Sequence, residues 1–416
     1  MKPFIFFIFL LTFFNTQSQE LLRFKVDAGV CDHQDCPVFL SVDRINLNTD
    51  DGNLSLFELV KGKEVPVASQ LENGHSARLW FVLQGKTKKG EKREFILKRE
   101  KSSAFSEKIK INKDHRDLKI EKNGKPVLNY RYAITYPPDG INPVYKRSGF
   151  IHPLVSPGGE VLTRIQAPDH YHHYGIWGPW TETLINNRKV DFWNLAKGEG
   201  TVQFAGFLSE VEGLVFSGFK ALQQHIDFGA KGPDQVALNE VLDVRVWNIS
   251  QSRWLIDYTT TMNCPLDSGI LFEAYRYGGG IGFRATERWH KANCTVLTSE
   301  GRTRANADGS NARWCLVEGE SSVPEGRSGI LFLSFPANRM HPEPMRVWPL
   351  DANGKRGDMF FEFCPIRHNE WKIEKGADYS LRYRMVVFDG KLTAEEAETY
   401  WQAFANPPRV IFNNFK

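Results

Sequence analysis

The 416-residue sequence predicts an all-β protein, in which a small N-terminal β-sandwich precedes a large β-sandwich that carries a C-terminal helix. Runs of β-branched, aromatic or alternating residues recur along the chain, separated by Asn-Gly, Asp-Gly and Pro-Gly-Gly turn signals. Short runs bounded by such turns are typical of strands. Because the chain has many of them and no long helical pattern, we expect packed sheets.

Strand patterns occur from the N-terminal region to the end of the chain. We expect strands over Pro37–Val42, Leu79–Leu83, Arg93–Lys98, Tyr130–Tyr136, Gln235–Val246, Trp254–Met262, Gly329–Ser334, Met359–Phe363 and Tyr379–Phe388. The basic stretch Lys86–Lys101 also contains glutamates and is expected to be a solvated hairpin. A second hairpin should follow the turn Pro157-Gly158-Gly159 and bring His152 and Arg164 near one end of a sheet.

One helix is expected, over about residues 394–405. Thr393-Ala394-Glu395-Glu396 has the sequence of a capping box, and Asn406-Pro407-Pro408 ends the helix. Its apolar face would carry Ala397, Tyr400, Trp401 and Phe404, so the helix should pack on the outside of a sheet.

The charged segment Ser102–Arg116 separates two parts of different composition. Ten of the 11 tryptophans and most of the histidines follow it. We therefore expect a small β-sandwich domain over residues 19–112 and a large one over residues 113–416.

The N-terminus has the features of a secretory signal peptide over residues 1–18. Lys2 supplies a positive charge, Phe4–Phe14 is almost entirely apolar, and small residues precede a cleavage site after Ser18. We expect a periplasmic or secreted protein. No later stretch reaches the ~18 apolar residues of a spanning helix, so no membrane span is expected after cleavage.

Composition argues against nucleic acid as a partner. The formal net charge is only +4, charged residues make up 25% of the chain, and no basic block lies beside repeated aromatics. Six cysteines in an exported protein permit disulfides. Cys31 and Cys36 flank a short polar loop and are the expected pair, whereas the other four can equally be buried thiols.

The segment Asp169–Trp180 concentrates more chemically active side chains than any other. It contains three of the 11 histidines and two tryptophans. In an extended strand, His170 and His172 share one face and Tyr171 and His173 the other. Such imidazoles can act as acid–base groups, bind a divalent metal or simply pack. A metal would need a third ligand, and Asp169, Asp191 or His341 are the candidates.

Two further segments have the composition of a binding site. Tyr275–Arg284 joins a glycine cluster to Arg276 and Arg284, which suit a carboxylate or sugar hydroxyls. Phe335–Pro344 is a proline-rich loop that offers Asn338, His341 and Glu343. Each segment can also be an ordinary surface connection.

Taken together, these motifs resemble a bacterial family often labelled methane oxygenase PmoA-like, over about residues 113–410. The motifs are His152-Pro153-Leu154 with its Ser-Pro-x-Gly turn, the Asp-His-x-His-His-x-Gly-Ile block from Asp169, Val190–Trp193, the Gly-Gly-x-Gly-x-Arg segment ending at Arg284, and Pro336-x-Asn338 with His341-Pro342. The resemblance implies a galactose-mutarotase-like supersandwich and a setting among polysaccharide-degrading genes. Members commonly have Arg after the paired histidines, where Tyr174 stands here. Methane oxidation itself is excluded, because such a subunit needs several membrane spans.

The leading hypothesis is an exported enzyme that acts on an oligosaccharide or modified sugar by acid–base chemistry. Hydrolysis, elimination and epimerisation are not distinguished by the sequence. The catalytic candidates are His170 or His172 as acid, His173 as orienting group, Glu182 or Glu343 as base, and His341. The substrate-binding candidates are His152, Arg164, Trp177, Trp193, Arg276, Arg284 and Asn338. A non-catalytic glycan-binding protein and a metal-dependent enzyme are the alternatives.

Overall fold

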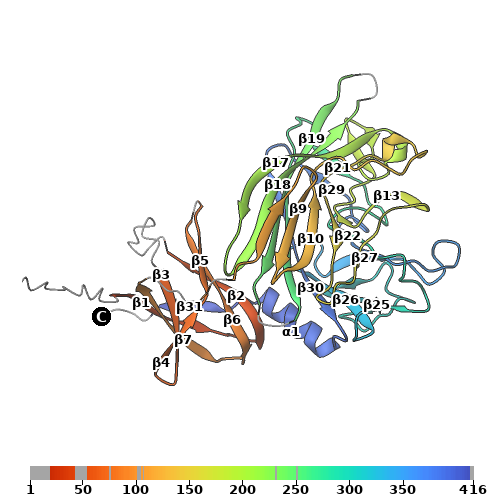
Figure 1. Ribbon diagram of the computed structural model, residues 1–416. Helices are drawn as coiled ribbons and strands as arrows, with labels where there is room; N and C mark the ends of the chain where they lie inside the picture. Colours follow the sequence, from red (N-terminus) through yellow and green to blue (C-terminus); the bar gives the residue numbers. More distant parts are fainter. Residues whose placement is uncertain are drawn as a thin grey trace, which may run out of the picture.

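The computed structural model describes residues 19–42, 54–74, 76–100, 105, 107–229, 232–249 and 252–412. The predicted signal peptide lies outside this part of the chain. The described residues form a small unit and a large unit, both built almost entirely of antiparallel strands (Figure 1). The all-β architecture predicted from the sequence is confirmed.

The large unit is built on two large sheets. The nine-stranded sheet has the order β24 (Asn311–Ala312), β27 (Glu343–Val347), β28 (Phe360–Phe363), β22 (Ile281–Arg284), β14 (Ile176–Trp177), β11 (Phe150–Leu154), β10 (Lys125–Arg131), β9 (Asp117–Lys122) and β8 (Lys110–Lys113). The eight-stranded sheet has the order β17 (Gly200–Val211), β18 (Phe216–Asp227), β19 (Gln235–Trp247), β20 (Trp254–Asn263), β30 (Asp378–Asp389), β26 (Arg327–Ser334), β25 (Trp314–Glu320) and β23 (Cys294–Thr298).

The main hydrophobic core lies between these two sheets. Side chains alternate along a strand, so every second residue faces the partner sheet. On β22, Ile281 and Phe283 belong to this core, whereas Arg284 belongs to the opposite, outer face. On β28, Phe361 and Phe363 point inward and Phe360 outward. The outer face of the nine-stranded sheet is therefore free to carry polar groups.

On the outer face, the ribbon of β12 (Ile165–Ala167) and β13 (His170–Tyr174) and the 3₁₀ turns Pro143–Tyr145 and Leu195–Lys197 contribute side chains to the aromatic cluster that contains Phe360. The four-stranded sheet of β16 (Arg188–Val190), β15 (Thr183–Ile185), β21 (Ile270–Phe272) and β29 (Trp371–Ile373) instead adds its apolar side chains to the main core. In Figure 1, β13 lies on the side of the large unit that is remote from the small one.

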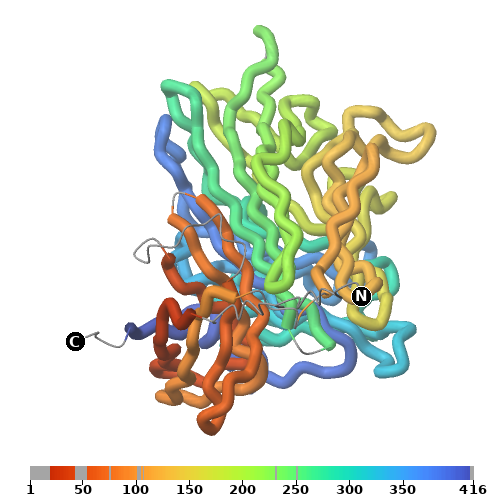
Figure 2. The backbone as a smooth tube through the Cα atoms, turned by 60° about the vertical axis from the view of Figure 1, so that its left-hand side comes forward, coloured from red at the N-terminus to blue at the C-terminus, as the bar shows by residue number. Residues whose placement is uncertain are grey.

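The small unit is a sandwich that the C-terminus of the chain completes. Its sheets are β31 (Arg409–Phe412), β1 (Gln19–Asp27), β7 (Lys92–Arg99), β3 (Leu54–Val60) and β4 (Lys63–Val67), and β2 (His33–Ser41), β6 (Arg78–Thr87) and β5 (Ser69–Glu72). The last strand, β31, pairs with β1. Figure 2 shows this C-terminal segment returning to the side of the N-terminal strands. Both ends of the described chain thus belong to the small unit.

The helix α1 (Ala394–Ala405) connects the two units. The predicted capping box forms, because Thr393 accepts from the N–H of Glu396 while the Glu396 carboxylate accepts from the N–H of Thr393. The predicted apolar face, including Tyr400 and Trp401, is buried. It packs in a cluster with residues of the eight-stranded sheet and Val82 of β6. No described helix is long and apolar enough to cross a membrane.

The expected strands are found, with one shift. Tyr130–Tyr136 was expected as a strand, but β10 ends at Arg131. The chain then leaves the sheet toward Pro137 and Pro138, where strand pairing cannot continue through two residues without an N–H.

The disulfide expected between Cys31 and Cys36 does not form, and all six cysteines are free thiols. Both sulfur atoms face the C-terminal end of α1 instead. The Cys31 Sγ lies 3.6 Å from the carbonyl oxygen of Gln402, and the Cys36 Sγ lies 4.0 Å from that of Ala403.

Candidate active site

The strand β13 lies over the outer face of the nine-stranded sheet because the chain turns sharply at Gly175. Its φ is +67°, and a Cβ atom at this position would lie 2.3 Å from the carbonyl oxygen of Ile151 on β11. Only glycine allows this close approach. The Gly175 N–H donates to the carbonyl of Arg164, and the Gly175 carbonyl accepts from the N–H of Arg284. These bonds fix the histidine segment beside both arginines.

His170, His172 and His173 form one cluster, which we call the histidine cluster. Their ring centroids lie 4.7 to 5.4 Å apart. The strand is extended, as predicted, but the expected separation of His173 from the other two is wrong. The ribbon is irregular between Ile165 and Ala167, so the faces do not alternate regularly.

His173 and His170 differ in their exposure to solvent. His173 is 1% exposed, and its ring contacts Trp193, Trp348 and Phe360 at centroid distances of 5.2 to 5.5 Å. The side chain of His170 is 32% exposed. Of these two residues, His170 can therefore contact a ligand without rearrangement, whereas His173 cannot.

An ion-pair chain holds His170. Its Nδ1 is 2.7 Å from Oδ2 of Asp169, and this oxygen also accepts from Nη2 of Arg284 at 2.8 Å. The same nitrogen contacts Oδ2 of Asp358 at 2.9 Å. The Arg284 guanidinium lies over the Trp348 ring, 4.7 Å from its centroid, and its side chain is 1% exposed. We call Asp169, Arg284 and Asp358 the Asp–Arg–Asp chain.

These contacts set the charge states around His170. Partial burial opposes ionisation of Asp169, but the His170 hydrogen bond and the Arg284 charge hold its pKa well below the usual range. Burial and the neighbouring His170 lower the pKa of His172 to about 4. Burial likewise lowers the pKa of His173 well below its ordinary value. At neutral pH the site therefore contains an ionised Asp169 and neutral His172 and His173.

Aromatic rings form a floor under the histidines, which we call the aromatic floor: Trp177, Trp193, Tyr277, Trp348 and Phe360. Trp177 and Trp193 were expected to stack on a substrate, but they are 1% and 5% exposed. Their rings pack against His173, and the Trp193 Nε1–H donates to the His172 carbonyl at 3.0 Å. Because these rings are already covered, a stacking role does not fit them.

The other predicted substrate-binding residues of this region lie at its margin. Arg164 pairs with Glu287 at 3.2 Å. Arg276 is exposed, and its guanidinium lies 5.4 Å from the centroid of Tyr277. His152 is on β11 and is hydrogen-bonded through Nδ1 to Thr163 at 2.9 Å. Burial lowers the pKa of His152 to about 4, so it is neutral.

Glu182 is not brought to the histidine cluster. It has a positive φ of 48° and pairs with Lys189 at 2.8 Å and Lys197 at 3.5 Å. Lys197 also pairs with Asp191, whose carboxylate accepts from the backbone N–H of Trp193. Glu182 thus belongs to a neighbouring ion-pair network that supports the turn before the aromatic floor.

Asn338, His341 and Glu343 form a separate cluster. Glu343 is fully buried on β27, on the same side as the core residues Met345 and Val347. Its carboxyl accepts hydrogen bonds from Ser334, Asn338 and Tyr383 at 2.6 to 2.9 Å. His341 contacts the Ser334 hydroxyl at 3.1 Å and stacks on Trp401. The cluster faces the sandwich interior and α1, whereas the histidine cluster lies on the outer face.

The buried Glu343 predicts a pH effect on stability. Burial raises its pKa to about 7, although three hydrogen bonds oppose the shift. A raised pKa stabilises the fold fully below the unfolded value of about 4.5, and this contribution is lost as pH rises through 7. The Glu343→Gln variant cannot ionise, so its free energy of unfolding relative to wild type should rise by about 3 kcal/mol between pH 4.5 and 8. Urea unfolding at both pH values measures this change, and parallel pH profiles of the two proteins would contradict it.

Several residues of the site are not apparent from the sequence. The sequence pattern indicates Asp169 only as a candidate metal ligand, and it gives no indication of Asp358 or Trp348. Arg346 is a further member: its guanidinium bonds to the Tyr277 hydroxyl at 3.0 Å and pairs with Asp308 at 2.6 Å. The alternation of side chains along β27 and β28 could have indicated two residues of the site. It places Arg346 and Phe360 on the face of the sheet away from the apolar core.

Glu362 is a buried acid below the same region. It is fully buried, and one carboxyl oxygen accepts from the Gly278 N–H at 2.6 Å. Burial raises its pKa well above the ordinary value, which favours the protonated form. It can donate a hydrogen bond, but it is sealed from solvent.

The described residues do not assemble a metal site. Among them, no group of three or more His, Cys, Asp and Glu side chains is placed to hold a metal ion. Asp169 is engaged by Arg284, and His341 belongs to the other cluster. The donor set expected for a metal-dependent enzyme is thus not brought together.

Comparison with known proteins gives one family and several similar structures. Residues 117–402 match the model described as "Family of unknown function (DUF6807)". The match gives no support to the PmoA-like label. No curated protein matches the chain significantly.

Two solved structures show similarity at 8% sequence identity. A heparan sulfate lyase HepC mutant from Pedobacter heparinus has a TM-score of 0.34, with 71% of this chain and 38% of that chain covered. A GalM/aldose epimerase homologue from C. elegans has a TM-score of 0.27, with 69% of this chain and 100% of that chain covered. This chain therefore spans about two fifths of the length of the lyase.

Proposed function

The chain belongs to the family of unknown function DUF6807, and we propose that it is an exported carbohydrate-active enzyme whose acid–base group is His170. The proposal of export depends on the N-terminal sequence pattern. The proposal of acid–base chemistry depends on the geometry around the histidine cluster.

The observation that carries the proposal is the contact between the Asp–Arg–Asp chain and a partly exposed imidazole. Ionised Asp169 accepts a hydrogen bond from Nδ1–H of His170, so this contact holds a ring proton on Nδ1. Nε2 is then the nitrogen that exchanges a proton with a ligand. Arg284 fixes the carboxylate, and the aromatic floor fixes Arg284. A purely structural histidine would not need this support.

The surrounding groups suit a hydroxyl-rich ligand. Arg164 offers a half-buried guanidinium, and its partner Glu287 is 68% exposed. Glu287 replaces Glu182 and Glu343 as the carboxylate that we assign as the second acid–base group, because it is joined to the site through Arg164. In this assignment, His170 exchanges a proton with a ring or glycosidic oxygen and Glu287 serves the opposite side of the sugar.

Incubation with a panel of oligosaccharides tests the function. We expect the protein without residues 1–18 to convert at least one neutral or acidic oligosaccharide, detected as a product by mass spectrometry or as an isomer by NMR. Asp169→Asn removes the charge that orients His170, so its turnover should fall below wild type. A panel in which sugars bind without any product would identify a glycan-binding protein and overturn the enzymatic proposal.

A further inference from the structure

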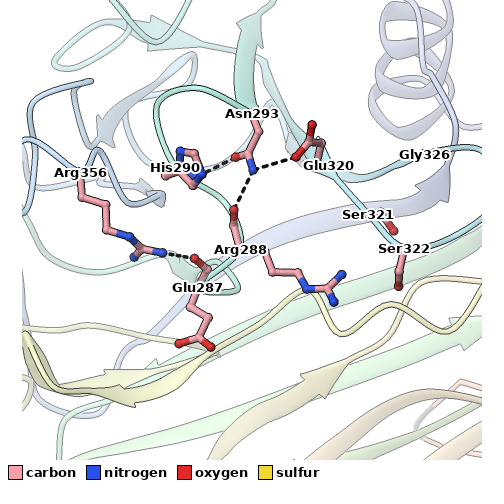
Figure 3. A pocket seen from close by; sticks show the side chains of 9 residues that line it. All are labelled: Glu287, Arg288, His290, Asn293, Glu320, Ser321, Ser322, Gly326 and Arg356. Atoms are coloured by element: carbon pink, nitrogen blue, oxygen red, sulfur yellow. Dashed lines mark hydrogen bonds between the residues drawn. The ribbon is translucent and has the colours of Figure 1, made fainter.

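A polar cavity adjoins the candidate site on the side of Glu287. Its volume is about 690 Å³, within the range of ligand sites. Figure 3 shows Arg356, Glu287 and Arg288 along one side, with His290, Asn293 and Glu320 along another. Ser321 and Ser322 lie on the neighbouring segment. Among the side chains that line the cavity, none is aromatic apart from the imidazole of His290.

Two contacts connect this cavity to His170. Arg356 pairs with Asp358, which belongs to the Asp–Arg–Asp chain that holds His170. Glu287 pairs with Arg164, whose backbone N–H donates to the carbonyl of Arg284. The cavity and the histidine cluster are therefore connected through ion pairs and a backbone hydrogen bond.

The charges in the cavity are already matched within the protein. Arg288 pairs with Glu160 at 3.2 Å, and Glu160 also accepts from the N–H of Ser322 at 2.9 Å. Glu320 accepts from Nδ2 of Asn293 at 3.2 Å. Arg356 pairs with Asp358, and Glu287 pairs with Arg164. Both arginines that line the cavity are therefore already paired with a carboxylate. A site for a uronate or sulfate would instead offer a guanidinium that awaits an anion.

A wall that alternates donors and acceptors suits a neutral sugar. Each sugar hydroxyl both donates and accepts, so it can bond to a guanidinium and a carboxylate at the same time. The serine hydroxyls and the imidazole of His290 add uncharged groups of both kinds. Glu287 and Glu320 would repel an anionic ligand, and the arginines that could attract it are already paired with carboxylates.

We infer that this cavity is a subsite for a neutral sugar unit, next to the unit that reacts at His170. The inference depends on the proposed function and adds the substrate class, a neutral oligosaccharide long enough to extend from His170 to Arg288.

The test compares neutral oligosaccharides of increasing length with acidic ones of the same length. For wild type, KM should fall as neutral units are added. Arg288→Ala should remove this gain and raise KM for the longer neutral substrates about tenfold, the effect of one charged hydrogen bond. Glu160 keeps its bonds to Ser322, so the fold should persist. Arg23→Ala, which breaks a comparable ion pair with Glu20 on the small unit, is the matched control and should leave KM unchanged.

A binding measurement separates this inference from the proposed function. Calorimetry with the His170→Ala variant and neutral oligosaccharides should show affinity that is lost on adding Arg288→Ala. Such binding without turnover by wild type would overturn the enzyme but support the subsite. Turnover with no length dependence, or tighter binding of acidic sugars that Arg288→Ala abolishes, would overturn the neutral subsite.

Discussion

Replacing His170 by alanine is expected to lower kcat/KM about 10²- to 10⁴-fold on any oligosaccharide that the wild type converts, the usual contribution of a general acid–base group. In the proposed mechanism, the ring exchanges its proton through Nε2 while Asp169 holds Nδ1 at 2.7 Å. Alanine removes the proton carrier and leaves the aromatic floor in place. Initial rates with a substrate from the panel measure the effect.

The fold should tolerate this change. The side chain of His170 is 32% exposed, and its partner Asp169 keeps the bond to Arg284 at 2.8 Å. The melting temperature should therefore stay close to that of wild type. His115→Ala, at an exposed position on the loop after β8, provides the matched control and should retain full activity. Activity of His170→Ala within threefold of wild type would remove His170 from the mechanism.

The strands and the helix were predictable because their signals are local. Trp254–Met262 alternates within one segment, and the capping box of α1 lies within four residues. The signal for the histidine cluster is equally local, since three histidines occur within four positions. Such patterns depend on neighbours in the chain and not on the tertiary fold.

The partners of the histidine cluster were not predictable in this way. Asp358 is 74 residues further along the chain than Arg284, with which it forms an ion pair. Trp348 lies between these two residues in the sequence. Only the pairing of β22 with β28 brings these segments together. The same reason explains why Glu182 and Glu343 were expected as catalytic bases. Both are acids near aromatic residues in the sequence, but in the fold Glu182 pairs with lysines and Glu343 is buried in the core.

The bulge at the ribbon explains the remaining error at the cluster. Period-2 alternation assumes regular pairing, and the pairing of β12 with β13 shifts between Ile165 and Ala167. Gln166 has a φ of +48° at that point. A bulge changes the direction of the following side chains, so His173 joins the two histidines from which alternation would separate it.

The largest stability effect is expected from Arg284→Met. Arg284 is the shared cation of Asp169 and Asp358, and its side chain is 1% exposed. Methionine fills much of the same volume over Trp348, but both carboxylates then lose their buried partner. Removing one member of a buried ion pair commonly costs about 3–5 kcal/mol. We expect a loss of that size in the free energy of unfolding, measured by urea denaturation at pH 7.

Arg164→Met is the matched control for this substitution, because Arg164 pairs with a carboxylate that is 68% exposed. A pair of that kind is worth under about 1 kcal/mol, so its loss should be small. Arg284→Lys keeps the charge but loses the planar guanidinium that lies over Trp348 and reaches both aspartates through Nη2, and its stability should lie between wild type and Arg284→Met. Equal losses in Arg284→Met and Arg164→Met would show that the Asp–Arg–Asp chain does not hold the site together. Because the proposed role of Asp169 in orienting His170 depends on Arg284, the ranking of activity among wild type, Arg284→Lys and Arg284→Met should follow their ranking of stability.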